Sequence, residues 1–528
     1  MNIARSLIVV FWLLMAGWLV RYEAFPRWFT ASAPGYRSLF KNGPLILDTW
    51  MQIEFRNTPI GYSHTWVDSD VESPNATYTL RNQTALNIKL MGQVQGVNVM
   101  AGATLDAGYA LQKFYTVVSS SVYTTRIEGR KTGEHTFAVR IRTDSGEQTV
   151  MLTVPDDVIL YSPVTEMALA DLKPGESLNL RVLDPVTLSV SDVRVEALRR
   201  EKLKSAGREQ EATVLKLVYQ GLETLSWMDS TGRILRQETP FGWTMTLCSA
   251  KDVFAFKQDA AGADNSAGAD DSAGVDDLLT AMAVPCRGQV QNPRACRMLK
   301  IRINGANLSP QNFASPRQIV EAWEDRRVCL TVRAQAGPSQ ADAPRSRLAS
   351  AKRSGVAGSA SGPEALRPFL ASSPAIQADH PAMVRQARAI VGDETNSWVA
   401  AQAIGDWVYR AIEKKAAVSL PSALDVLARR EGDCNEHTYL FVALARAAGL
   451  PARIHVGLVY SEMDGAPGAF YYHAWPSVYV GEWVELDPTL GQKTVDATHI
   501  SVAQGEIADQ LKLLGLLGQV SVEIVEQN

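Results

Sequence analysis

A cysteine in the C-terminal part of the sequence has the local setting of a reactive thiol. Cys434 follows Gly432 and Asp433 and opens an apolar helical stripe that ends before Gly449. Asp433 is predicted to cap this helix, with Glu436 reaching back from the third helical position as a capping box. The free N–H groups at a helix start favour a thiolate over a thiol, so we expect Cys434 to react with iodoacetamide well below about pH 8.

A hairpin predicted downstream carries a histidine and an aspartate on one face. Its strands are residues 472–480 and 483–488. Their aliphatic residues share a core face if the connection contains an odd number of residues, for example 480–482. In that register Asp487 is a diagonal neighbour of His473 on the opposite face, about 7–8 Å away, which lets carboxylate and imidazole hydrogen-bond. The pattern therefore predicts a general base and the acid that orients it.

Other residues of this region receive weaker assignments. Trp475 and Trp483 share the face of the histidine, and they either line an acyl-substrate cleft or pack against the helix. Glu436 is expected to be a cap rather than an acid catalyst, and His437 and His455 are expected to be structural. The cysteine and histidines of the region lack the two compact ligand pairs of a zinc site, so neither a metal nor an organic cofactor is expected.

Three stretches of this region resemble the transglutaminase-like superfamily, in its bacterial membrane-anchored type. They are GDCNEHT at 432–438, the Gly-Leu-Pro-Ala-Arg break at 449–453, and HAWPSVYVGEWVELDPT at 473–489. The family pattern is a Gly-x-Cys at a helix start, a His-Ala-Trp strand and an Asp-Pro on the next strand. The resemblance begins near Pro381 and continues through 496–500.

This resemblance implies a papain-like core and a thiol enzyme. In the family pattern Cys434 is the nucleophile, His473 is the general base and acid, and Asp487 fixes the imidazole. The implied enzyme acts on peptide or carboxamide bonds of a protein, peptide or cell-wall substrate through a cysteine thioester, which passes to water or to an amine. The alternative is a non-catalytic module that uses the same core to hold a wall or protein partner.

The rest of the chain divides by pattern into further regions, and the fold class is α+β. Polar and apolar residues alternate with period two from 45 to 258, which predicts a large antiparallel β-rich domain. The regions that follow are an acidic low-complexity insertion at 259–277, a small β extension at 278–335, a flexible linker at 336–375, and the transglutaminase-like catalytic domain at 376–528, where the period becomes helical.

The N-terminal residues 1–22 contain an uncharged apolar run between Arg5 and Arg21. As a helix this run reaches about 22 Å, short of the ~30 Å hydrocarbon core, and its length is that of a signal peptide. No small-x-small cleavage site directly follows it, so we favour an uncleaved anchor in the bacterial inner membrane with the body in the periplasm. A cleaved signal and a soluble periplasmic protein are the alternative.

Composition excludes two classes of protein. With 52 Lys and Arg against 56 Asp and Glu, the formal charge of −4 lacks the cationic footprint of a nucleic-acid binder. Five cysteines in 528 residues are too few for a disulfide scaffold. Apart from the candidate nucleophile, Cys286 and Cys296 are closest in sequence and are the expected bridge in an oxidising compartment, while Cys248 and Cys329 stay unassigned. The sequence does not set the number of subunits.

Overall fold

The structure is a computed structural model of the full chain. It describes residues 31–32, 48–70, 77–90, 92–155, 158–160, 169, 172–205, 207–240, 242–253, 277–305, 313, 315–324, 326–338, 363–416, 418, 420, 422–462, 468–516 and 518–528. The expected membrane anchor at 1–22 and nearly all of the acidic insertion at 259–277 lie outside these residues. Within the described ranges, no helix combines the length and the apolar character needed to cross a bilayer.

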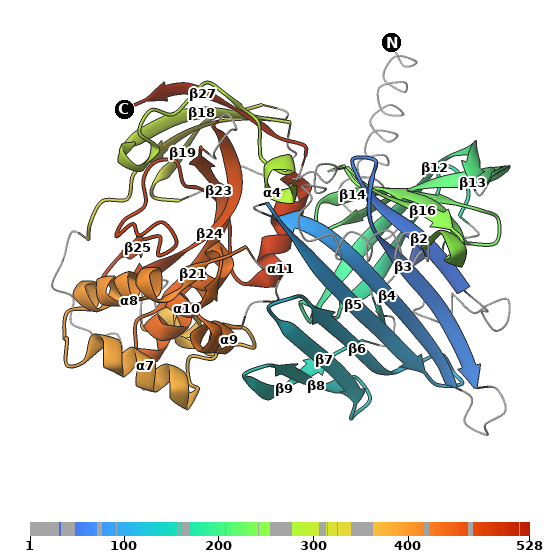
Figure 1. The fold of residues 1–528 in the computed structure, drawn as a ribbon, viewed down its shortest axis with the longest axis horizontal. Coiled ribbons are helices and arrows are strands. Elements are labelled where there is room, and N and C mark those ends of the chain that lie inside the picture. The colour runs from blue at the N-terminus through green and yellow to red at the C-terminus, as the bar shows by residue number, and fades with distance from the viewer. Residues whose placement is uncertain are drawn as a thin grey trace, which may run out of the picture.

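A large, mainly antiparallel sheet forms the first half of the molecule, which confirms the predicted β-rich domain (Figure 1). In the described residues it contains 16 strands, arranged as two meanders that join where β16 pairs with β2. The first meander consists of β2 (Asp48–Phe55), β3 (Thr58–Asp70), β4 (Thr77–Leu90), β5 (Gln93–Leu105), β6 (Leu111–Ser119), β7 (Thr124–Lys131), β8 (Thr136–Thr143) and β9 (Gly146–Thr153). The second consists of β11 (Ser177–Asp184), β12 (Ser189–Ser205), β13 (Arg208–Tyr219), β14 (Leu222–Met228), β15 (Ile234–Glu238) and β16 (Trp243–Cys248). Two short strands, β1 (Ala31–Ser32) and β10 (Val158–Leu160), pair with β11 in parallel.

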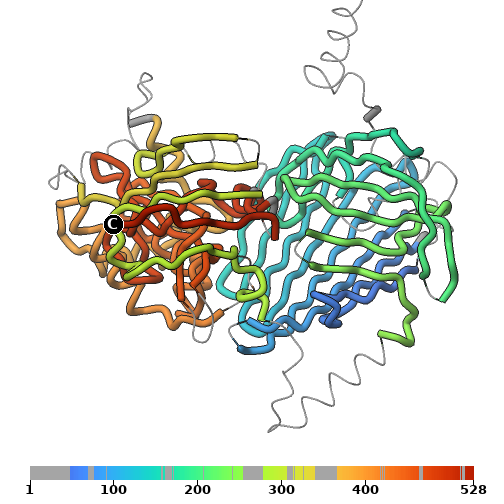
Figure 2. The backbone as a smooth tube through the Cα atoms, turned by 90° about the horizontal axis from the view of Figure 1, so that it is seen from above, coloured from blue at the N-terminus to red at the C-terminus, as the bar shows by residue number. Residues whose placement is uncertain are grey.

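The alternating sequence places one face of this sheet in a common core. In β2, for example, Met51, Ile53 and Phe55 are buried while the residues between them are partly exposed. The sheet curls, as Figure 2 shows, and one hydrophobic cluster contains Phe114 of the first meander and Val195 of the second. The two meanders therefore enclose the core between them.

The last third of the chain combines helices with an antiparallel sheet. The helices are α7 (Pro381–Val391), α8 (Ser397–Ala411), α9 (Ala423–Arg429) and α10 (Cys434–Ala447), and the sheet has the order β25 (Trp483–Glu485), β24 (Ala469–Tyr479), β23 (Ala452–Ser461) and β26 (Ile500–Gln504). The pair β21 (Glu413–Lys414) and β22 (Glu431–Gly432) precedes α10, and α11 (Ile507–Gln510) and the 3-10 helix η9 (Leu511–Leu516) follow β26. Side chains cap α8 (Asn396), α9 (Ser422) and α10 (Asp433), and the last is the cap that the sequence predicts. The predicted α+β class is confirmed.

A third sheet joins the small β extension to the end of the chain. Its order is β17 (Cys286–Arg287), β27 (Ser521–Gln527), β18 (Met298–Asn304), β20 (Arg327–Arg333) and β19 (Gln318–Glu324), with the short helices α4 (Leu278–Ala281) and η5 (Pro293–Ala295) beside it. Its core is continuous with Tyr460 of β23 and Phe470 of β24. The extension and the C-terminal helix–sheet region therefore share one hydrophobic core.

Two expectations about this part of the chain differ from the structure. Residues 363–370, assigned to the flexible linker, form α6 (Pro363–Leu366) and the 3-10 helix η8 (Arg367–Leu370). Leu370 is buried, and η8 contacts α10 and β23. The expected bridge between Cys286 and Cys296 is not formed, and both thiols are free. Cys286 lies in a strand paired with Val522, whereas the Cys296 thiol donates to the Met298 carbonyl at 3.4 Å.

A buried ion pair connects the extension to the four-stranded sheet β25-β24-β23-β26. Arg317 Nη2 lies 2.7 Å from Glu485 Oε2, and the two side chains are only 5% and 6% exposed. Arg317 also donates to the carbonyl oxygens of Arg333 and His499, at 2.7 and 3.2 Å. The same Glu485 oxygen accepts the Trp475 indole N–H at 2.9 Å.

Removing the cation of this pair is expected to destabilise the fold strongly. Arg317→Met leaves the Glu485 carboxylate buried without its counter-charge, so we expect the free energy of unfolding to fall by about 3–5 kcal/mol in urea denaturation. The double variant Arg317→Met with Glu485→Gln removes the uncompensated charge and is expected to recover part of this loss. A loss below about 1 kcal/mol in the single variant, the range of exposed pairs, would contradict the argument.

Candidate active site

Cys434 lies at the first position of α10, in the capping box that the sequence predicts. Asp433 Oδ1 accepts the Asn435 N–H at 2.9 Å, and Glu436 Oε2 accepts the Asp433 N–H at 2.9 Å. Gly432 precedes this box with φ 154°, and a Cβ added there would approach the Glu436 side chain to 2.3 Å. Glycine is therefore needed for the chain to turn into the helix at this point.

The start of α10 docks on β24 beside His473. Thr438 Oγ1, one turn into the helix, donates to the Ala474 carbonyl oxygen at 3.0 Å. The Ala474 N–H donates toward the Cys434 sulfur. Because Ala474 follows His473 directly in β24, the thiol and the imidazole come from adjoining points of one helix–sheet interface.

The hairpin has the register predicted from its side-chain parity. Tyr479 pairs with Trp483 and Ser477 with Glu485, so the connection is residues 480–482. His473 Nε2 lies 2.8 Å from Asp487 Oδ2. An ionised carboxylate only accepts, so Nε2 carries the proton and Nδ1 is left as the basic nitrogen.

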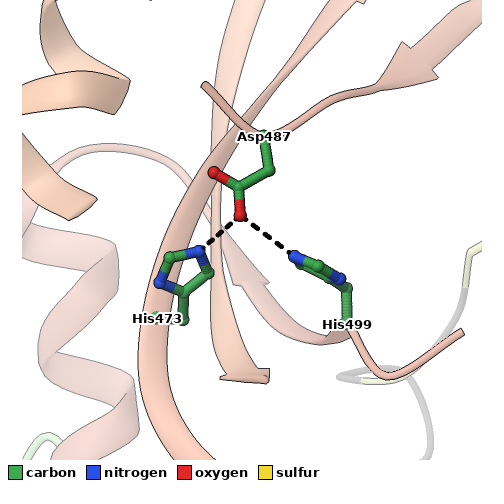
Figure 3. A group of neighbouring side chains, drawn as sticks. All are labelled: His473, Asp487 and His499. Carbon is green, nitrogen blue, oxygen red and sulfur yellow. Dashed lines mark hydrogen bonds and ion pairs between the residues drawn. The ribbon is translucent and has the colours of Figure 1, made fainter. Parts of the chain in front are cut away.

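Asp487 is held from two further sides. Its Oδ1 accepts the backbone N–H groups of Thr489 and Leu490, at 2.7 and 3.1 Å. Its Oδ2 also faces Nε2 of a second histidine, His499, at 3.2 Å (Figure 3). The far nitrogen of that ring, Nδ1, lies 3.3 Å from Asp496 Oδ1. One carboxylate therefore receives two imidazoles, and neither imidazole is free to rotate away from it.

His499 and Asp496 were not predicted as site residues, although the resemblance extends over both. The Asp-x-x-His spacing of 496–499 is the signal in the sequence, because a separation of three residues suits a local carboxylate–imidazole bond. The Asp496 carboxylate is itself paired with Arg294 Nη1 at 2.8 Å. This chain of contacts runs from the small β extension to the carboxylate beside His473.

The pKa values of Asp487 and His499 are shifted in opposite directions by their contacts. Burial alone would raise the pKa of Asp487, but His473 and then His499 hold that pKa well below its usual range. Burial alone would lower the pKa of His499, but hydrogen bonds to Asp487 and Asp496 raise it overall. Asp487 is therefore ionised and serves as an acceptor for both rings.

Replacing His499 by phenylalanine is expected to weaken catalysis through Asp487 while keeping the buried ring. We expect kcat to fall by about 10–100-fold, as is typical when a supporting partner of a functional group is lost. The raised pKa of His499 keeps its ring protonated to higher pH than an ordinary histidine, and its ring centroid lies 5.8 Å from that of His473. Loss of this positive charge should move the acid limb of the pH–rate profile to higher pH. A purely structural role would lower activity without moving that limb.

The control for this variant is His455→Phe. His455 is another buried imidazole of the same sheet, but its nitrogens contact Ser501 and Ser477, at 3.0 and 2.9 Å, and not Asp487. Burial lowers the pKa of His455 to about 4, so it is neutral near pH 7. Its replacement should leave the pH–rate profile in place, and an equal shift in both variants would refute the assignment of His499.

The surroundings of Cys434 act against the thiolate that is expected from the helix start. Burial raises the pKa of the Cys434 thiol well above its ordinary value, and the neighbouring Asp433 carboxyl raises it further, while the Ala474 N–H acts in the opposite direction. Loss of solvent together with an acidic cap acts against the positive end of the helix and favours the thiol over the thiolate.

This raised pKa predicts the pH dependence of alkylation. A group with a raised pKa keeps its proton through neutral pH and loses it only as the pH rises past the raised value. Iodoacetamide should therefore modify Cys434 at pH 7 more slowly than a free cysteine peptide, whose pKa is about 8.5, and the rate should still be rising above that pH. Mass spectrometry of the Cys434 peptide measures this rate, and a plateau below about pH 8 would contradict it.

The group also has the ligand types of a metal site. Ligand atoms of His473, Asp487 and His499 all lie within 4.8 Å of one another, and histidine and aspartate are common zinc ligands. A metal here would have to replace the protons shared between each Nε2 and the carboxylate. The hydrogen bonds therefore fit a proton-sharing group, and the absence of a metal remains a prediction.

Of the two alternatives for Trp475, lining a cleft or packing, its environment favours packing. The side chain is fully buried, and its ring stacks near those of His455 and His473, with centroid distances of 5.9 and 6.0 Å. Its indole N–H donates to Glu485, so the whole side chain can be buried without an unpaired polar group. Trp483 lies at the hairpin turn, where its ring contacts Phe369 edge-on. The Arg453 guanidinium lies over the Trp483 ring, with Cζ 4.1 Å from the ring centroid.

Comparison with known proteins bears on this region. Residues 384–488 match the model of the transglutaminase-like superfamily. This stretch contains Cys434, His473 and Asp487. No curated protein matches the chain.

Three solved structures are similar to parts of the chain. A candidate cysteine protease from Cytophaga hutchinsonii is 16% identical, with 44% of this chain and 89% of that chain covered and a TM-score of 0.29. The periplasmic domain of TgpA from Pseudomonas aeruginosa is 14% identical, with 38% and 92% covered and a TM-score of 0.22. A β-barrel-like protein of a domain of unknown function from Brucella abortus is 10% identical, with 39% and 98% covered and a TM-score of 0.30.

Proposed function

We propose that this protein is a thiol enzyme that acts on peptide or carboxamide bonds through a cysteine thioester. The observation that carries the proposal is the 2.8 Å bond between His473 Nε2 and Asp487 Oδ2, at the point where the helix that begins with Cys434 meets the sheet. A nucleophile, a base and a group that orients the base are the parts that covalent acyl transfer requires.

The proposed reaction follows from which nitrogen of His473 carries the proton. Asp487 holds the Nε2 proton of His473, so Nδ1 accepts the thiol proton as Cys434 attacks the substrate carbonyl. The tetrahedral oxyanion then collapses, the C–N bond breaks, and the imidazolium gives its proton to the departing amine or ammonia. A thioester on Cys434 remains. Because the resting thiol is protonated, deprotonation accompanies attack rather than preceding it.

The second half of the reaction transfers the acyl group. His473 removes a proton from water or from an acceptor amine, which attacks the thioester and restores the thiol as the product leaves. The Cys434 backbone N–H is our candidate donor to the oxyanion, and each such donor contributes about 3–4 kcal/mol in other acyl-transfer enzymes. We favour water as acceptor, because an extracytoplasmic cleft is hard to keep dry.

The proposal includes a location and a substrate class. The apolar N-terminal run supports a single anchor in the bacterial inner membrane with the body in the periplasm, where protein and cell-wall peptides are accessible. Cleavage of that run as a signal peptide would instead release a soluble periplasmic enzyme. A non-catalytic module that binds a wall or protein partner is the competing function, and the raised pKa of Cys434 is the observation that favours it.

Trapping of the thioester separates these possibilities. The full chain is incubated with a mixture of glutamine-containing peptides and cell-wall stem peptides, then acid-quenched, and the Cys434 peptide is weighed by mass spectrometry. We expect an acyl adduct on Cys434, absent in Cys434→Ala and retained in Cys248→Ala, which removes a half-buried cysteine of the β-rich domain. Incorporation of biotin-cadaverine identifies transamidation, and new termini without it identify hydrolysis. Binding without an adduct supports the non-catalytic module.

A further inference from the structure

A large cavity in the described part of the protein lies apart from the residues of the candidate active site. It has a volume of about 560 Å³ and lies inside the curled sheet of the β-rich domain. Both meanders supply its walls, and α11 and η9 of the catalytic region supply the rest. Apolar side chains dominate the lining, among them Ile53, Val99, Leu217, Met245, Ile507 and Leu511. This volume lies in the range of roughly 300–1,000 Å³ that is usual for small-molecule sites.

The cavity exists because one row of the sheet carries small side chains. Asn82, Ala101 and Thr116 are in register across β4, β5 and β6. The row two residues further along carries Leu80, Ala103 and Phe114, and there the Phe114 ring fills the core. Protein interiors are otherwise close-packed, and an empty apolar space of this size forfeits the contacts of every side chain around it. A bound molecule would restore those contacts.

The polar groups of the lining define the class of that molecule. Among the described residues that line the cavity there is no lysine or arginine, so these residues offer an anionic head group no counter-charge. The charged residue among them, Asp184, already accepts the Tyr219 hydroxyl and the Val186 N–H, each at 2.8 Å. Thr116 is only 2% exposed, and in the described structure its hydroxyl has no hydrogen-bond partner. The wall therefore offers one free neutral hydroxyl in an apolar space.

We propose that this cavity binds a neutral chain-like lipid: a long apolar body with a single uncharged hydrogen-bonding group that meets the Thr116 hydroxyl. The lid of the site comes from the catalytic region. Gln510 of α11 donates to the Tyr439 hydroxyl at 3.0 Å, and Glu506 accepts from Ser373 at 2.6 Å, which fixes α11 over the cavity. The site is thus complete only when both halves of the chain are present.

A fluorescent probe and a competitor test this proposal on the full chain after removal of lipid. N-phenyl-1-naphthylamine, an uncharged apolar dye, should bind saturably at one site, and 1-hexadecanol should displace it at lower concentration than palmitate. Ala101→Phe fills the small-residue row and should weaken binding by about tenfold or more. The matched control is Met100→Phe, the adjacent residue of β5, which is 45% exposed on the opposite face and should leave affinity unchanged.

A second variant keeps the test decisive if Ala101→Phe does not fold. Thr116→Val has the same shape but lacks the hydroxyl, so it should weaken 1-hexadecanol binding by about fivefold and leave the dye affinity unchanged. Absence of saturable dye binding to the delipidated full chain overturns the proposal, as does equal binding by the Ala101→Phe and Met100→Phe variants when both are folded. Stronger competition by palmitate, or no effect of Thr116→Val on 1-hexadecanol, overturns the assignment to a neutral lipid.

Discussion

Replacement of Cys434 by alanine is expected to reduce kcat by about 10⁴-fold or more, to the limit of detection. The variant removes the atom that forms the thioester, and His473 and Asp487 have no other nucleophile to activate. Loss of the nucleophile in a catalytic triad costs this much or more in comparable enzymes. The measurement is cleavage of the peptide identified by thioester trapping, with the extent of folding checked by thermal unfolding.

Cys434→Ser provides the sharper comparison. It keeps the helix start and the approximate volume, but the hydroxyl is much harder to deprotonate than a thiol, so activity should remain close to that of the alanine variant. Cys248→Ala should retain full activity. Full activity in Cys434→Ala would exclude the thiol mechanism, whatever the geometry of the histidine and the aspartate.

Replacement of Asp487 by asparagine is the second large effect that we expect, a fall in kcat of about 10⁴-fold. In the wild type Oδ2 accepts from both His473 and His499, at 2.8 and 3.2 Å, and can only accept. An asparagine amide can present an N–H to His473 instead, which forces the imidazole into the tautomer that cannot take the thiol proton. The same substitution in a serine protease triad has an effect of this size.

The matched control is Asp496→Asn, which alters the other carboxylate of the group. Asp496 contacts His499 and Arg294 but not His473, so its replacement should cost about 10–100-fold in kcat. KM should change little in either variant, because neither aspartate is placed to contact substrate. Equal losses in the two variants would mean that Asp487 has no special relation to His473.

The β-rich fold, the hairpin register and the contact between His473 and Asp487 were predictable because they rest on local periodicity. Alternation within the hairpin fixes which residues share a face, and the requirement for a common aliphatic face fixes the connection at 480–482 and brings Asp487 to His473. Capping chemistry fixes the start of α10 in the same way. Each of these features depends on residues close to one another in the chain.

The features that could not be predicted depend on contacts with distant segments of the chain or on the path of an irregular loop. The alternation of residues along the strand places Trp475 on the same face as His473. It does not reveal that Arg317, from the small β extension, forms a buried ion pair with Glu485 on that face. His499 reaches Asp487 only after an irregular segment, whose path no periodicity specifies. The pKa of Cys434 is set by burial, which a helix start in the sequence cannot disclose.

The pairing of β27 with β18 has a practical consequence for recombinant work. The last strand of the chain lies between strands that precede the catalytic helices, and Figure 1 shows it running beside β18 at the edge of the molecule. A truncated fragment limited to the family-matched stretch 384–488 would lose β26 and expose the apolar surface of Tyr460 and Phe470, an aggregation hazard. Expression boundaries for crystallisation or assay should therefore begin before β17 and retain the chain to Asn528.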